Sequence, residues 1–119
     1  MERWGIESYE NDDTYNYFGP YPSQMTEYAL NNSIQRAIAH YLRKSSGELE
    51  ETPVVGTVVF CIDIGHKIRT KSHLEVALEI ARKWTNNKDY LDDWKAPKQR
   101  KARLEVEIKT MEEALDGYN

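Results

Sequence analysis

The feature that most constrains this chain is the apolar run from Thr52 to Ile68, TPVVGTVVFCIDIGHKI. Its β-branched and aromatic residues favour a strand, and periodicity alone cannot assign so short an apolar run. The polar residues decide between the two. At about 100° per residue, Gly56, Asp63 and Lys67 share one narrow side of a helix, opposite most of the apolar side chains. The sequence therefore favours a helix over a strand for this run.

The ends of the run agree with a helix. Thr52 is a suitable N-cap, and Pro53 suits the first helical position. We therefore predict a buried central helix, Pro53–Ile68, around which the other elements pack. Gly56 and Gly65 each cost about 1 kcal/mol in a helix interior relative to alanine, so we expect a neighbouring helix to cross closely at those points.

The segments before the run predict two helices. Asn11-Asp12-Asp13 can cap a short first helix and complement its dipole, and the glycine and prolines of Gly19–Pro22 end it. A second helix is expected to start at Ser23, to run to about Lys44 and to stop at Ser45–Gly47. Its expected buried stripe is Met25, Tyr28/Ala29, Ile34, Ala37/Ile38 and Tyr41/Leu42. Glu48–Glu51 is then an acidic loop.

The segments after the run predict two more long helices. Ser72 and Glu75 form a capping box for the first of them, with a single helical turn expected within 88–96. The last helix starts at Pro97 and stops at Gly117. The expected buried residues are Leu74, Ala77/Leu78, Ala81 and Trp84 in one helix, and Leu104, Ile108, Met111 and Leu115 in the other. The predicted fold is all-α: a single bundle-like or orthogonal domain, residues 1–119, of four long helices and a short first one.

Composition limits the class of protein further. The chain has 119 residues, 39% of them hydrophobic and 30% charged, which is polar for a globular domain but short of the disordered class. No run of about 18 apolar residues predicts a membrane span, and the acidic start does not resemble a secretory signal. Cys61 is the single cysteine, so no disulfide framework is expected. These features predict a cytoplasmic protein.

Two ends of the chain resemble a known family. Trp4-Gly5 followed by Asn11-Asp12-Asp13 resembles the opening of a bacterial family of domains of unknown function. Trp94 before the basic helix start Pro97–Leu104 is similar to the C-terminal part of that family. This chain departs from it in the Gly19–Pro22 break and in its unusually aromatic first segment. The resemblance implies an all-α fold and transfers no catalytic residue.

Four residues are the candidates for chemistry: Asp12, Asp13, Asp63 and His66. Adjacent carboxylates with an imidazole could bind a metal ion for a hydrolytic enzyme. However, no pair has the spacing of metal ligands on a helix, and neighbouring side chains point about 100° apart. Capping and ordinary polar contacts explain these residues better, and the scattered glycines form no phosphate loop. We therefore expect no catalytic residue, no metal and no cofactor.

The last helix carries its charges in an unfavourable order. Lys98, Arg100, Lys101 and Arg103 crowd its start, where the helix dipole favours acids. Three explanations compete. The bases are solvated, or they dock internally on the acidic segment Glu7–Asp13, or they bind an external acidic partner or nucleic acid. A net charge of −4 argues against the nucleic acid.

The function favoured by the sequence is protein–protein interaction or regulation, of the kind exerted by an immunity or inhibitor protein. Tyrosine and arginine are enriched at the centres of interfaces, and the chain has more tyrosines than its helix stripes need. The expected interaction surface is Tyr9, Tyr15, Tyr17, Tyr21, Tyr90, Lys98, Arg100, Lys101 and Arg103. The alternatives are the metal-dependent enzyme and a nucleic-acid-binding regulator that uses Lys98–Arg103. The oligomeric state stays open.

Overall fold

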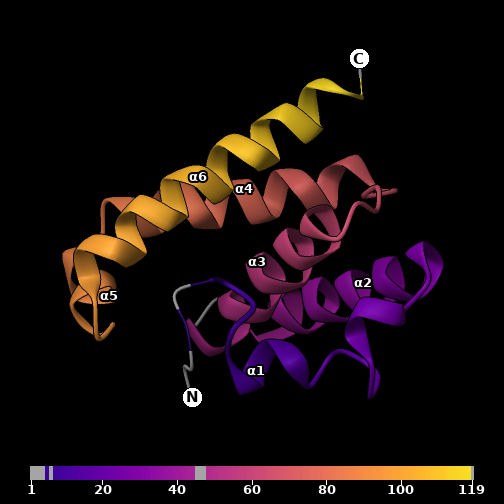
Figure 1. The fold of residues 1–119 in the computed structure, drawn as a ribbon, viewed down its shortest axis with the longest axis horizontal. Coiled ribbons are helices and arrows are strands. Elements are labelled where there is room, and N and C mark those ends of the chain that lie inside the picture. Colours follow the sequence, from indigo (N-terminus) through magenta and orange to yellow (C-terminus); the bar gives the residue numbers. More distant parts are fainter. Residues whose placement is uncertain (1–4, 6, 45–47, 119) are drawn as a thin grey trace.

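The computed structural model describes residues 5, 7–44 and 48–118, and these residues form helices joined by turns and loops, with no β-strand. The elements are α1 Asp12–Tyr15, η1 Pro22–Gln24, α2 Glu27–Lys44, α3 Glu48–Asp63, α4 Lys71–Thr85, α5 Lys88–Asp92 and α6 Pro97–Asp116 (Figure 1). The prediction of a compact all-α domain with four long helices and short additional ones is confirmed. Within the described part of the chain, no helix has the length and apolar character that crossing a bilayer requires.

Helix α3 is the centre of the molecule. It packs against α1, α2, α4 and α6, and every residue from Glu51 to Cys61 is buried. Figure 1 shows α2 beside α3, while α4 and α6 run alongside each other. A helix that is apolar on all sides has to be enclosed in this way, so the predicted buried central helix is confirmed.

The predicted bounds of that helix, Pro53–Ile68, are wrong at both ends. The helix begins at Glu48, so Glu48–Glu51 forms its first turn rather than a loop, and Pro53 lies inside it. Carboxylates in a first turn complement the positive end of the helix dipole, which explains the earlier start. At the other end the helix stops at Asp63, and Gly65 lies in a loop.

Gly65 ends α3 because it adopts a left-handed backbone, with a φ of 91°. The Gly65 amide donates to the Ile62 carbonyl, and the His66 amide donates to the Cys61 carbonyl. This pair of hydrogen bonds is the Schellman motif, in which a glycine after the last helical residue satisfies the final carbonyls. Gly65 is therefore a helix stop, and no neighbouring helix crosses there: the space next to its α-carbon is open.

Gly56 has the close crossing that the sequence predicted. A Cβ atom on Gly56 would lie 2.3 Å from Thr14 Oγ1 and 2.7 Å from the Ser8 carbonyl oxygen. The absence of a side chain at this point lets the segment before α1 and α1 itself lie directly on α3. Asn11 caps α1 as predicted, because its side chain accepts a hydrogen bond from the Thr14 amide at 2.8 Å.

Two predicted helix starts are wrong. α2 begins at Glu27 rather than Ser23, because residues 22–24 form a separate turn and Thr26 Oγ1 caps the helix by accepting from the Ala29 amide. α4 begins at Lys71, before the predicted Ser72 capping box, and its N-cap makes no side-chain hydrogen bond. The predicted stop at Ser45–Gly47 lies outside the described residues. α5 and both ends of α6 agree with the prediction.

The buried stripe of α2 differs from the prediction. Leu30, Ile34, Ala37 and Ile38 are buried, but two expected members of the stripe point outward. Tyr28 is 63% exposed and Leu42 is 68% exposed. Their exposure leaves large apolar side chains on the outer face of α2.

Candidate interaction surface and the buried charges of α6

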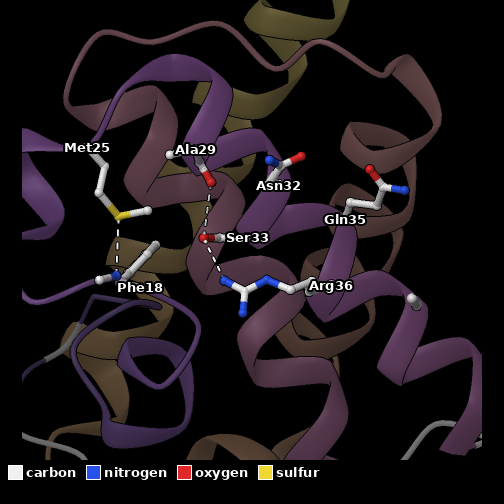
Figure 2. A pocket seen from close by; sticks show the side chains of 9 residues that line it. Phe18, Met25, Ala29, Asn32, Ser33, Gln35 and Arg36 are labelled. Atoms are coloured by element: carbon white, nitrogen blue, oxygen red, sulfur yellow. Dashed lines mark hydrogen bonds between the residues drawn. The ribbon is translucent and has the colours of Figure 1, made fainter.

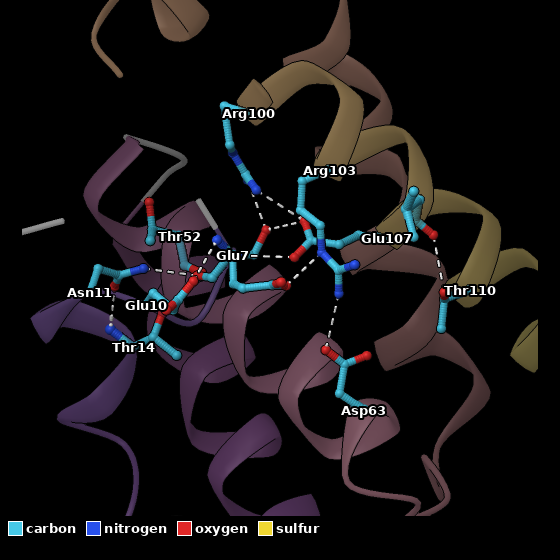
Figure 3. A network of polar contacts seen from close by, with 12 residues as sticks. Glu7, Glu10, Asn11, Thr14, Thr52, Asp63, Arg100, Arg103, Glu107 and Thr110 are labelled. Carbon is cyan, nitrogen blue, oxygen red and sulfur yellow. Dashed lines mark hydrogen bonds and ion pairs between the residues drawn. The ribbon is translucent and has the colours of Figure 1, made fainter. Parts of the chain in front are cut away.

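Two residues of the predicted interaction surface, Arg100 and Tyr90, lie inside the protein. Arg100 on α6 is fully buried, and its Nη1 atom donates to Glu107 Oε1 at 3.1 Å. Its Nη2 atom donates to Ser8 Oγ at 2.8 Å and to the Tyr90 hydroxyl at 3.0 Å. Ser8 in turn donates to both carboxylate oxygens of Glu107, from Oγ at 2.6 Å and from its amide at 2.9 Å. Figure 3 shows Arg100 and Glu107 within this network.

Three aromatic rings surround the same guanidinium. The Trp84 and Tyr90 rings are stacked with their centroids 4.6 Å apart, and the Arg100 guanidinium carbon lies 4.3 Å from the centre of the Trp94 ring. A cation over an aromatic face is stabilised by up to about 2 kcal/mol or more when water is excluded. Arg100 therefore joins α4, α5 and α6 to the N-terminal segment, and it is structural.

Arg103 forms a second, more open cluster. Its Nε atom donates to Glu7 Oε2 at 2.7 Å, and its Nη2 atom lies 3.5 Å from Asp63 Oδ2. Burial raises the pKa values of Glu7 and Asp63, and this effect outweighs the lowering by Arg103. Burial lowers the pKa of Arg103, but its carboxylate neighbours raise it more. The arginine is therefore a fixed cation beside two partly buried acids.

These contacts decide where each predicted cation lies. Of the three explanations left open for these cations, internal docking on the acidic N-terminal segment applies to one pair, Arg103 with Glu7. Lys98 and Lys101 are exposed. Arg100 and Tyr90 are buried, so their predicted place on an exposed interaction surface is wrong. The sequence contained a signal for this: Arg100 and Glu107 are in phase with the buried Leu104 and Met111.

The tyrosines of the predicted interaction surface also differ in exposure. Tyr9 and Tyr15 pack edge-on against the buried Phe60 ring of α3, at centroid distances of 5.1 and 6.3 Å. The Tyr17 hydroxyl lies 2.7 Å from His40 Nδ1 on α2. Tyr21, by contrast, is 69% exposed. Among these four tyrosines, Tyr9 and Tyr15 therefore cover α3, Tyr17 contacts α2, and Tyr21 projects into solvent.

The residues of the enzyme alternative do not form a metal site. Within the described ranges, no group of three or more His, Cys, Asp or Glu side chains could hold an ion, and this includes Asp12, Asp13, Asp63 and His66. The Asp63 carboxylate faces Arg103 instead. Cys61 is buried, and its burial raises the pKa of the thiol to about 12, which keeps it protonated. A thiol in that state is a poor nucleophile.

The outer face of α2 carries a regular pattern that the sequence analysis missed. Five exposed residues follow one another at alternating spacings of four and three, which is the spacing of the inward positions of a coiled coil. We call this set the α2 seam, and its members are Tyr28, Asn32, Gln35, Ala39 and Leu42. None of the five is charged. The sequence signal was present, but Tyr28 and Leu42 had been assigned to the buried stripe.

A groove runs beside the seam, between α2 and the segment 17–25. Its larger hollow has a volume of about 720 Å³ and its smaller one about 260 Å³, and they share Arg36 and Ala39 (Figure 2). Among the residues that the structure describes, no carboxylate lines the two hollows. Their lining consists of two arginines, Arg36 and Arg43, of aromatic and aliphatic side chains, and of small or polar residues: Tyr17, Phe18, Met25, Ala29 and Ala39, with Gly19, Asn32, Ser33, Gln35 and His40. We call this feature the α2 groove.

Arg36 is held in place at the centre of the groove. Its Nη2 atom donates to the Tyr17 carbonyl oxygen at 2.8 Å and to Ser33 Oγ at 3.3 Å. The Gly19 amide donates weakly to the Met25 sulfur at 3.5 Å on the opposite wall. The groove is therefore formed by fixed side chains from two segments of the chain.

Comparison with known proteins gives no relative, because no family model, no curated protein and no solved structure matches this chain. The resemblance to the bacterial family, carried by Trp4-Gly5 and Asn11–Asp13, stays a prediction. Trp4 itself lies outside the described residues.

Proposed function

We propose that this protein is a binding module that regulates another protein by covering part of its surface, as an immunity or inhibitor protein does. The observation that carries the proposal is the outer face of α2. Tyr28 and Leu42 are large apolar side chains, 63% and 68% exposed, at the two ends of one uncharged seam. Asn32, Gln35 and Ala39 lie between them, and the groove lined by Phe18 and Met25 runs alongside. An exposed face that combines apolar side chains, polar groups and a hollow is typical of surfaces that bind another protein.

The remaining functional candidates of the sequence lack such support. Of the four cations in the nucleic-acid alternative, two are exposed, Lys98 and Lys101. Arg100 is buried, and Arg103 is paired with Glu7. Two lysines give a weak electrostatic footprint on a chain of net charge −4.

Photo-crosslinking tests the proposal. A photoreactive phenylalanine analogue in place of Gln35, at the middle of the seam, should form a discrete adduct with one protein in cells that produce this chain. The same analogue in place of the exposed Glu79 on α4 is the matched control and should form none. Leu42→Asp should remove the adduct formed at position 35. Failure to form an adduct at 35, or equal adducts at 35 and 79, would overturn the proposed function.

A further inference from the structure

The charges around the α2 seam are one-sided. In heptad terms, Asn32 and Ala39 take one inward position, and Tyr28, Gln35 and Leu42 take the other. Arg36 and Arg43 then fall seven residues apart on one flank of the seam, where coiled coils place the charges that select a partner. Both arginines are exposed.

No acid balances these cations along the helix. From Tyr28 to Lys44 the chain contains no aspartate or glutamate, although it has 20 acidic and 16 basic residues in total. The single carboxylate of α2, Glu27, is at the far end and is already bonded to Arg69 and to the Lys67 amide. Along its own length α2 is therefore a positive, partly apolar strip on an acidic protein. Acids of other elements also act on the groove, because burial, and then Glu50 and Asp13, raise the pKa of Tyr17 in its wall.

We propose that the α2 seam and groove bind an acidic amphipathic helix of another protein. This inference rests on the proposed function and names the chemistry of its partner. The partner's apolar side chains would lie along the seam between Tyr28 and Leu42, and its carboxylates would pair with Arg36 and Arg43. The larger hollow, floored by Phe18 and Met25, has room for one bulky apolar side chain of that helix.

Two details of the site support a helix as the occupant rather than an extended peptide. α2 is a helix whose backbone groups are bonded internally, so it offers an extended peptide no strand edge to pair with. Asn32 and Gln35 are polar groups at inward positions, and such groups select register and partner at a cost in affinity. A modest, selective interaction is the expected result.

The test uses three synthetic peptides of about three heptads. The first is acidic, with leucine and alanine at the inward positions and glutamate at the flanking ones. The second replaces glutamate with lysine, and the third keeps the acidic composition but scatters the leucines. Each is titrated into the isotope-labelled full chain, and backbone amide resonances are followed. The acidic amphipathic peptide should shift resonances of residues 25–43, and the other two should not.

Charge reversal supplies the matched control. Arg43→Glu should weaken binding of the acidic peptide by about tenfold or more, since a like charge then faces each carboxylate. Lys109→Glu makes the same change in net charge on the exposed side of α6 and should alter binding by less than about twofold, because charges beyond a Debye length of about 8–10 Å are screened at physiological salt. Amide spectra of both variants establish that they are folded.

The results separate this inference from the function on which it rests. Equal binding of the acidic and basic peptides, or equal losses in the two variants, would overturn the inference. So would a duplex DNA oligonucleotide that shifts the α2 resonances when the acidic peptide does not. If the adduct at Gln35 forms but the captured segment is neutral or basic, the binding module stands and this class of partner is wrong.

Discussion

At the scale of single residues, the charges of α6 are explained by burial. Arg100 and Glu107 lie seven residues apart, on the same side of the helix as the buried Leu104 and Met111. The ion pair between the Arg100 guanidinium and the Glu107 carboxylate is therefore shielded from water, in an interior where a charge without a partner is costly. The cations at the start of α6 oppose the helix dipole by a few tenths of a kcal/mol each. The buried contacts of Arg100 outweigh a cost of that size.

Removal of one member of this pair should destabilise the protein strongly. Arg100→Met leaves the Glu107 carboxylate buried without its cation, and breaking a buried ion pair in this way costs about 3–5 kcal/mol. Denaturant unfolding monitored by circular dichroism measures the loss. The double variant Arg100→Met/Glu107→Leu should recover a large part of it, because no charge is then left unpaired.

The exposed pair Arg82–Glu112 is the matched control for that experiment. Its side chains are 55% and 47% exposed, and an ion pair in that setting contributes about 0–1 kcal/mol. Arg82→Met should therefore change the free energy of unfolding little. If Arg82→Met and Arg100→Met cost the same, the buried network has no special role.

The carboxyls near Arg103 give a pH dependence with a definite sign. Burial raises the pKa of Glu7 above its ordinary 4.5 and that of Asp63 above its ordinary 3.8. A carboxyl with a raised pKa binds its proton more tightly in the folded state. The stability it contributes is complete below the ordinary pKa and is lost as the pH rises through the folded value. The contribution of these two carboxyls to the free energy of unfolding should thus fall as the pH rises through that range, whereas Glu27, whose pKa is lowered by its bonds to the Lys67 amide and Arg69, contributes with the opposite sign.

Asp63→Asn tests this expectation, because asparagine does not titrate. Urea unfolding at a series of pH values should show a smaller fall in stability for the variant than for the parent chain. At a pH low enough to protonate both acids, parent and variant should unfold with similar free energies. An equal change of stability with pH in the parent and in Asp63→Asn would contradict the assignment.

At the scale of the elements, the central helix depends on a position without a side chain. Gly56 lies where the Ser8 carbonyl and Thr14 pass over α3, and a methyl group there would meet both. Because one of those neighbours is backbone, the collision cannot be relieved by a side-chain rotation. The position therefore couples the N-terminal segment to the core.

Gly56→Ala should cost about 1–3 kcal/mol, the usual range for overpacking a well-filled interior. Thermal unfolding measures the effect. Gly19→Ala is the control, since no atom lies within 4 Å of the added methyl group, and it should change stability by less than about 0.5 kcal/mol. A Gly56→Ala protein as stable as the parent would show that α1 and α3 can separate without loss.

The elements also show what could be predicted from the sequence. The all-apolar α3 and the periodic stripe of α4 were predictable because burial follows the spacing of apolar side chains. The prediction for the outer face of α2 is wrong because Tyr28 and Leu42 are apolar. In the sequence, an apolar residue that is exposed cannot be told from one that is buried. Arg100 was misassigned for the opposite reason: a charge enters the interior only with partners such as Ser8, 92 residues away, and spacing cannot show such contacts.

At the scale of the whole molecule, the N-terminal segment is bonded to the middle of α6. Glu7 and Ser8 bond to Arg103 and Glu107, at sequence separations of 96 and 99 residues. The same N-terminal segment lies on α3 at Gly56, so it contacts both the centre and α6. α2 lies outside these contacts, and its outer face keeps Tyr28 and Leu42 exposed. The N-terminal segment is thus packed on α3 and α6, while the outer face of α2 stays open to solvent.

The final prediction concerns cooperativity. Because the N-terminal segment joins α3 to α6, the described helices should unfold together. In a Trp4→Phe background, tryptophan fluorescence comes from Trp84 and Trp94, both buried beside Arg100, and follows the α4–α6 side, while circular dichroism follows all helices. The two probes should give coincident transitions in denaturant, as a two-state domain requires. Ser8→Ala removes a hydroxyl that contacts Arg100 and Glu107, and it should shift both curves equally to lower denaturant. If it shifts only the tryptophan curve, the α6 side unfolds as a separate unit, and the contact between the N-terminal segment and α6 is not what stabilises α3.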